Sequence, residues 1–189
     1  MNNQSQNAID IILAESLKEL AAKKPIEKIT IKEITDKAGV IRPTFYNHFQ
    51  DKYELLEWIT VNEIFLPTDP LFGNGMLKEG ITFILTAMVR DAEFYKRAVQ
   101  LEGQNSFNDI FVRCVAQTIK KYIKLDKLEA VGKFPWLTVD VVADFYAHTI
   151  GYVVIEWIRG GMRVPTEELT EVAISMFQSS MLEILKKSD

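Results

Sequence analysis

The sequence predicts an all-α protein of about nine helices, in which a fourth helix joins an N-terminal three-helix head to a C-terminal helical bundle. Apolar residues recur at three- and four-residue spacing along most of the 189 residues, which is the period of an amphipathic helix. Capping residues and clusters of Gly and Pro separate these segments, and no convincing strand pattern occurs. We expect two domains, at residues 1–65 and 66–189.

The first helix is predicted from apolar residues that recur between Ile9 and Ala21. Lys23-Lys24-Pro25 ends it, since cations suit a helix C-terminus and the residue before a proline avoids the helical region. The lysine-rich stretch from Lys18 to Lys32 also holds two glutamates, so we interpret it as a solvated face.

A helix-turn-helix is predicted next. Thr30 and Glu33 form a capping-box pattern that starts a second helix at residue 31. Gly39 supplies the left-handed residue of a tight turn, and Pro43 suits the first turn of a third helix because its missing N–H is not needed there. The third helix should carry one apolar stripe, made of Ile41, Phe45 and Phe49.

The fourth helix begins at Asp51, which with Glu54 forms its cap, and should close the head near residue 65. The densest group of breakers, Pro67 to Gly75, then marks the boundary or hinge between the domains. Beyond it we predict helices at about residues 76–90, 92–102, 106–124, 138–159 and 166–186.

Composition excludes several classes of protein. The net charge of −4 and the pI of about 5.4 repel nucleic acid, so any DNA binding needs a local basic face. Cys114 is the only cysteine and the two histidines are far apart in sequence, which argues against a metal site. Phosphate-loop and nucleophile motifs are lacking, so we expect no enzyme activity and no cofactor. The polar start and the lack of a span-length apolar run predict a cytoplasmic protein without membrane contact.

The third helix carries the local basic face that DNA binding needs. No acidic residue occurs between Asp36 and Asp51. That segment instead holds side chains that suit phosphates and base edges, namely Lys37, Arg42, Thr44, Tyr46, Asn47 and His48, with Lys52 just beyond. Lys28 and Thr30 are further candidates for contacting the DNA backbone. The alternative interpretation is a helical hairpin with a solvated polar face.

The sequence is similar to the TetR family of bacterial regulators over roughly residues 8–60. Two segments carry the resemblance, ITIKEITDKAGV at residues 29–40 and RPTFYNHFQDKYELL at residues 42–56. The resemblance implies that phosphates are anchored by Thr44, Tyr46 and Lys52. It also implies that base edges are met by Arg42, Pro43, Asn47 and His48.

One position departs from the family pattern. Ile41 stands where the family usually has a serine, whose hydroxyl caps the recognition helix. Such a cap is typically worth ~1 kcal/mol, so we expect weaker DNA binding unless Pro43 compensates.

The C-terminal part more faintly resembles the Firmicutes-type branch of this family, in the pair Phe94-Tyr95 and the stretch from Trp157 to Met162. Some members of that branch, the activators of dihydroxyacetone kinase operons, respond to a protein partner. The resemblance therefore leaves two kinds of control open, by a small molecule and by a protein.

We expect a sequence-specific DNA-binding transcriptional regulator, in the first instance a repressor released by a small apolar or aromatic ligand. The alternative is a transcriptional activator, coactivator or interaction module that a protein partner controls through the C-terminal domain. Candidates for a ligand pocket are aromatic residues, for which ordinary core packing is the alternative, namely Phe83, Phe94, Phe111, Tyr146 and Tyr152.

A homodimer is predicted from the segment Val139 to Ile158, which is apolar on almost every side and must be buried on several faces. We expect helices 138–159 and 166–186 to pair with those of a second copy. Two-fold symmetry then requires a palindromic operator in double-stranded DNA.

Overall fold

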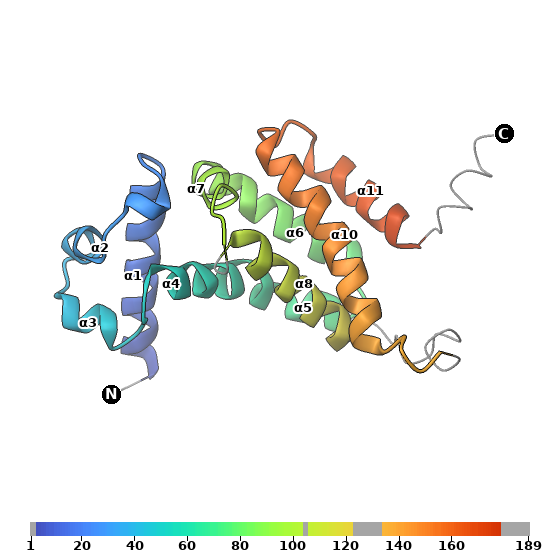
Figure 1. Ribbon diagram of the computed structural model, residues 1–189, viewed down its shortest axis with the longest axis horizontal. Coiled ribbons are helices and arrows are strands. Elements are labelled where there is room, and N and C mark those ends of the chain that lie inside the picture. The colour runs from blue at the N-terminus through green and yellow to red at the C-terminus, as the bar shows by residue number, and fades with distance from the viewer. Residues whose placement is uncertain (1–2, 104–105, 123–133, 179–189) are drawn as a thin grey trace.

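Every regular element in the part of the chain that the structure describes is helical, which confirms the predicted all-α class (Figure 1). The computed structural model describes residues 3–103, 106–122 and 134–178. Figure 1 shows α1 (Asn3–Ala21), α2 (Ile31–Ala38) and α3 (Arg42–Tyr46) at one end of an elongated molecule. The helices of the C-terminal part lie at the other end, and α4 (Lys52–Ile59) runs between the two ends.

The head forms as its local signals predict. The short helix η1 (Ile26–Lys28) leads into α2, where Thr30 and Glu33 make the complete capping box. Gly39 then adopts the left-handed conformation, with φ of 69°. The core of the head is fully buried and includes Leu13, Leu17, Ile34, Phe45 and Leu55.

The helical path that begins with α4 continues well past residue 65. It passes through the π-helix η2 (Thr60–Phe65), the 3-10 turn η3 (Leu66–Thr68) and α5 (Asp69–Gly73). Pro67 and Pro70 lie within this path without ending it, and the path breaks only at residues 74–76, before α6 begins at residue 77. Pro67 and Pro70 each occupy the first turn of a new helical segment, where a missing N–H breaks no intrahelical bond. The predicted domain boundary therefore falls inside a continuous helical path.

The C-terminal helices lie close to their predicted positions. They are α6 (Leu77–Arg90), α7 (Ala92–Ala98), α8 (Phe107–Tyr122), α10 (Val139–Arg159) and α11 (Thr166–Gln178). The predicted helix 92–102 ends earlier, at Ala98. The predicted ends of helices 106–124 and 166–186 extend into residues 123–124 and 179–186, which lie outside the described residues.

Helix α10 packs closely along α8. A Cβ on Gly151 of α10 would lie 2.6 Å from the Val112 Cγ2 atom of α8, so only glycine permits this approach. Among the described helices α10 alone is long and apolar enough to cross a membrane, with 44% of the tested stretch buried. Core helices meet the same criterion, and the contact with α8 assigns α10 to the C-terminal core.

Candidate nucleic-acid interface and apolar cavity

Three side chains of α3 are exposed, those of Arg42, Pro43 and Tyr46, and Thr44 is half-buried. The C-cap residue Asn47 is exposed next to them. The Arg42 Nη2 group donates a hydrogen bond to the Tyr46 hydroxyl at 3.2 Å. The guanidinium also lies 5.8 Å from the centre of the tyrosine ring, within cation–π range. The Arg42 side chain therefore lies along the exposed side of α3, the second helix of the helix-turn-helix.

Ile41 does not belong to the buried stripe of α3, contrary to the sequence expectation. Phe45 and Phe49 are 0% and 4% exposed, whereas Ile41 is 69% exposed. The reason is that Ile41 is the N-cap of α3, with extended backbone angles (φ −87°, ψ 154°), so helical periodicity does not apply to its side chain. Its apolar side chain cannot accept a hydrogen bond, and α3 starts with Pro43 in its first turn, as the sequence suggested.

Lys28 and Thr30 are exposed at the approach to α2. The Thr30 hydroxyl accepts a hydrogen bond from the Glu33 N–H at 3.2 Å, and the Glu33 carboxylate accepts one from the Thr30 N–H at 2.9 Å. A hydrogen bond from Lys24, followed by that from the Thr30 N–H, lowers the pKa of Glu33 to about 2. The Glu33 carboxylate is therefore ionised, caps α2 and forms an ion pair with Lys24.

Lys52 is half-buried and holds the connector before α2. Its ammonium donates to the backbone oxygens of Glu27 at 2.7 Å and Ile29 at 2.8 Å. Burial lowers the pKa of Lys52. An ammonium has three donors, so one remains for a phosphate while the other two fix the connector to α4.

His48 points into the head. Its side chain is 8% exposed, and its Nδ1 atom lies 2.6 Å from the Asp10 Oδ1 atom of α1. The structure therefore separates His48 from the exposed residues of α3, and a contact between His48 and base edges would require this pair to open. Asp10 was missed by sequence reasoning because it is 38 positions away and no local pattern links the two residues.

An apolar cavity of about 230 Å³ lies in the C-terminal part. Helices α6, α8, α10 and α11 supply most of its wall, including Ile81, Leu85, Val115, Ile150 and Ala173. Of the five aromatic candidates, the structure brings two to this cavity, Phe111 and Tyr146.

The other three aromatic candidates lie elsewhere. Phe94 is buried in the core, with its ring 5.0 Å from that of Tyr95. Phe83 and Tyr152 are 38% and 69% exposed, because each lies on a different helical face from the residues of its own helix that line the cavity. The sequence identified these aromatic residues as candidates but did not show on which face of its helix each one would lie.

Three hydroxyl groups in the cavity wall are already engaged by the chain itself. Thr118 donates to the Cys114 backbone oxygen at 2.9 Å, and Thr149 donates to that of Phe145 at 3.0 Å. The Tyr122 hydroxyl donates to Asp69 at 2.7 Å. The wall that these residues leave for an occupant is therefore largely hydrocarbon, which suits an apolar molecule.

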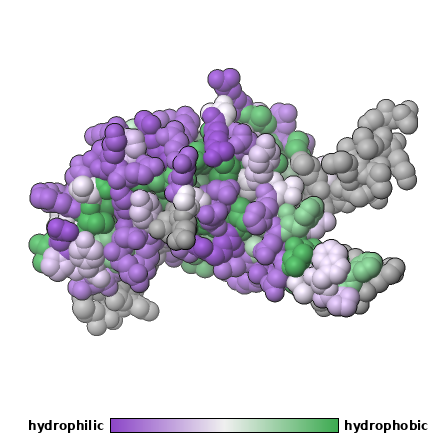
Figure 2. Space-filling model, in the orientation of Figure 1, coloured by the Kyte–Doolittle hydropathy of each residue, from purple (hydrophilic) through white to green (hydrophobic). Residues whose placement is uncertain are grey.

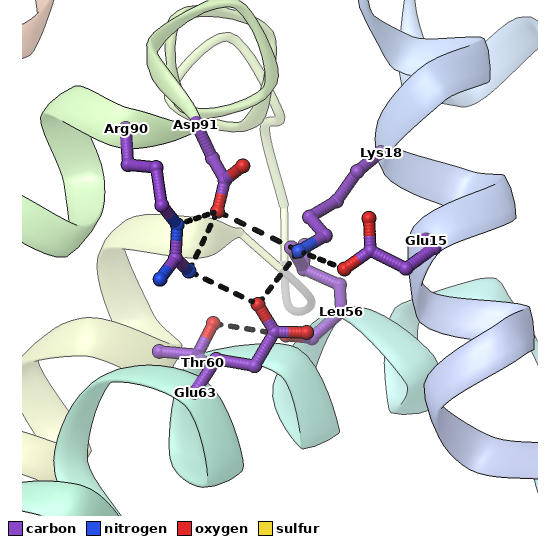
Figure 3. A network of polar contacts seen from close by, with 7 residues as sticks. All are labelled: Glu15, Lys18, Leu56, Thr60, Glu63, Arg90 and Asp91. Atoms are coloured by element: carbon purple, nitrogen blue, oxygen red, sulfur yellow. Dashed lines mark hydrogen bonds and ion pairs between the residues drawn. The ribbon is translucent and has the colours of Figure 1, made fainter. Parts of the chain in front are cut away.

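A cluster of charges connects the head to the C-terminal part (Figure 3). Lys18 of α1 is 6% exposed, with its ammonium 2.7 Å from both Glu15 and Glu63 and 3.5 Å from Asp91. Arg90 also pairs with Asp91, at 3.0 Å. The interpretation of Lys18 as part of a solvated face was therefore wrong, because η2 and the junction of α6 with α7 cover it.

Exposed apolar side chains gather over the start of α10 (Figure 2). They include Phe134, Trp136, Val141 and Phe145, of which Trp136 and Phe145 are 69% and 67% exposed. Tyr152, about two turns after Phe145, extends the exposed apolar surface along α10.

Comparisons with known proteins agree with this architecture. Residues 13–59 match a family model described as bacterial regulatory proteins of the tetR family. Residues 76–179, more than half of the chain, match a model described as a transcriptional regulator C-terminal region.

Individual relatives include an activator and a repressor. The chain is 38% identical over 52 residues to the HTH-type dhaKLM operon transcriptional activator DhaS of Lactococcus lactis, a segment that is 28% of each protein. A solved structure of a dihydroxyacetone kinase operon activator DhaS has a TM-score of 0.64 at 21% identity, covering 89% of this chain and 93% of that one. NalD, the secondary repressor of the MexAB-OprM multidrug efflux pump in Pseudomonas aeruginosa, has a TM-score of 0.59 at 17% identity, covering 89% and 94%. At these identities the two structures establish a shared fold.

Proposed function

The chain belongs to the TetR family of transcriptional regulators, and from this premise we propose that it binds a palindromic operator under the control of an apolar ligand. The observation that carries the proposal is the position of Phe65. This residue lines the C-terminal cavity and also ends η2, the direct continuation of α4. An occupant of the cavity would therefore contact the same helical path that supports the DNA-reading head.

In this proposal the position of each residue in the head decides whether it contacts base edges, contacts the DNA backbone or supports the head. Arg42 and Pro43 on α3, and Asn47 at its C-cap, are exposed and are assigned to base edges. Thr44, Tyr46 and Lys52, with Lys28 and Thr30 near the start of α2, are assigned to the DNA backbone. His48 is assigned to the head itself, since its pair with Asp10 supports α3 from the α1 side.

The route from cavity to head runs through two sets of contacts. At the head end, Lys52 of α4 holds the carbonyl oxygens that precede α2. At the other end, Glu63 of η2 joins Lys18 of α1. A ligand that favours one position of this path would change operator affinity by the ratio of its affinities for the two states. Helices with a π-bulge often occur at functional sites, and the π-helix η2 itself carries Glu63, the second of these anchor points.

A homodimer fits the exposed apolar surface on α10, since two copies that cover it would hold two heads apart on one duplex. The two-domain division at residues 65 and 66, and a cytoplasmic location, are part of the same proposal.

Control by a protein partner is the second candidate, as the resemblance of the C-terminal part to the Firmicutes-type branch implies. The similarity to DhaS, an operon activator, favours activation as the outcome. In that case the C-terminal surface binds a protein, the cavity has no regulatory role, and the outcome is activation.

The test begins with the operator. Purified protein selects duplexes from a random pool, and fluorescence polarisation then measures its affinity for the selected DNA at two salt concentrations, since phosphate contacts make binding salt-dependent. Arg42→Ala and Asn47→Ala should change the preferred sequence, whereas Tyr46→Phe should weaken binding to all duplexes alike. Lys120→Ala, on α8 far along the chain from the head, is the matched control.

The cavity is tested with a filling variant. Ile81→Trp on α6 places a larger side chain in the cavity, while Thr86→Trp on the exposed face of the same helix is its control. An apolar compound that weakens operator binding should act on the control and lose its effect on Ile81→Trp. Equal responses of the two variants would refute the cavity as the control site and favour the protein-partner alternative.

A further inference from the structure

Ile41 is exposed at a position where neither folding nor helix capping accounts for an isoleucine. It is 69% exposed, so it adds little to the core of the head, and its side chain has no atom that could cap α3. The core residues around α3, such as Phe45, are complete without it. A large apolar side chain is thus held in solvent by the extended backbone of an N-cap residue.

The location of Ile41 is at the start of the second helix of the helix-turn-helix. In this motif the N-terminal residues of the second helix contact base edges in the major groove. Arg42 and Pro43, the next two residues, are exposed beside it. The charge around Ile41 also favours DNA, because no acidic residue lies between Asp36 and Asp51. An apolar group at this point therefore faces the groove if the head binds DNA.

We propose that Ile41 is a specificity-determining residue that recognises the C5 methyl group of a thymine in the operator half-site. This inference rests on the proposed DNA-binding function and deepens it. The major-groove edges of the base pairs present hydrogen-bonding groups and one apolar group, the thymine methyl. The sec-butyl side chain of Ile41 can bury against that methyl group, whereas a hydrogen-bonding edge next to it would lose water without gaining a partner.

The experiment uses the operator that the 189-residue chain selects from a random pool. Each thymine of one half-site is replaced in turn by deoxyuridine, which removes the methyl group and keeps the base pair. Fluorescence polarisation then compares wild type, Ile41→Ala and the control Val89→Ala, which changes an exposed apolar side chain on α6. Thermal unfolding should be the same for all three proteins, because both altered side chains are exposed.

One deoxyuridine should weaken wild type and Val89→Ala roughly fourfold, the effect expected for one buried methyl group. The same substitution should leave the affinity of Ile41→Ala unchanged. If no thymine shows this dependence, or if the two losses simply multiply, Ile41 does not contact a thymine methyl. If wild type enriches no duplex at all, the proposed function itself fails, and this result is distinct from an enriched operator that is indifferent to deoxyuridine.

Discussion

Replacement of Lys18 by methionine should strongly destabilise the protein, because it removes the cation at the centre of the cluster in Figure 3. Its ammonium lies within 3.5 Å of three carboxylates from three parts of the chain, Glu15, Glu63 and Asp91. Burial by itself lowers the pKa of Lys18, but the hydrogen bonds with Glu15 and Glu63 outweigh it, so the pKa is raised. Methionine keeps most of the apolar stem and leaves these carboxylates facing one another, with Arg90 as the remaining cation nearby.

The size of the effect follows from burial. Removing one partner of a buried ion pair costs about 3–5 kcal/mol. Glu63 and Asp91 are only 18% and 21% exposed, but Glu15 is 55% exposed and is well screened by water, so we take the lower end of that range. A loss of about 3 kcal/mol corresponds to a fall in Tm of roughly 6–12 °C for a chain of this size. Because the pKa of Lys18 is raised, its contribution is fully present below its unfolded value of about 10.4 and is lost only at higher pH, as pH rises through the folded pKa.

The assay is thermal and urea unfolding of wild type, Lys18→Met and the control Lys78→Met. Lys78 pairs with Glu171 at 3.1 Å, but these side chains are 57% and 68% exposed, so the control should change stability by less than about 0.5 kcal/mol. Glu63→Gln should cost less in the Lys18→Met background than in wild type, since the two residues are coupled. Equal stabilities of Lys18→Met and Lys78→Met would refute the reasoning that the cluster fastens the head to the C-terminal part.

Other predictions follow from single contacts. Because the pKa of Glu33 is lowered from 4.5 to about 2, its capping contribution to stability should be complete above pH 4.5 and disappear as the pH falls toward 2. Glu33→Gln should therefore reduce the loss of stability between pH 4.5 and pH 2. An unchanged loss of stability over this range would contradict the prediction. Gly151→Ala should destabilise by about 1–3 kcal/mol in urea unfolding, against the usual gain for alanine in a helix, since the added Cβ overlaps α8; any stabilisation would refute the close approach. Burial raises the pKa of Cys114 to about 11, so at pH 8 native protein should react with iodoacetamide far more slowly than protein unfolded in urea. Asp10→Asn should weaken binding to all duplexes without changing the preferred sequence, because His48 supports α3 from within the head; a changed preference would restore His48 to base reading.

Local signals in the sequence determined much of the head. The capping box of Thr30 and Glu33, the left-handed Gly39 and the Asp51 cap depend on residues at most four positions apart, so short-range stereochemistry is sufficient to predict them. The all-α class and the approximate bounds of the C-terminal helices follow in the same way from helical periodicity. The family resemblance was also visible in two short segments of the head.

Tertiary structure decided which side each residue faces and what it meets. The Ile41 side chain does not lie on the predicted apolar stripe, because a cap residue has extended backbone angles. Lys18 is buried and not exposed, because Glu63 and Asp91, 45 and 73 positions away, cover it. Only two of the five aromatic candidates line the cavity. Four helices supply most of the cavity wall, and the sequence of one helix does not determine how it is rotated against the other three. Periodicity specifies that a helix has an apolar face, but the partner of that face depends on long-range packing, and this packing formed both the cavity and the buried charge cluster.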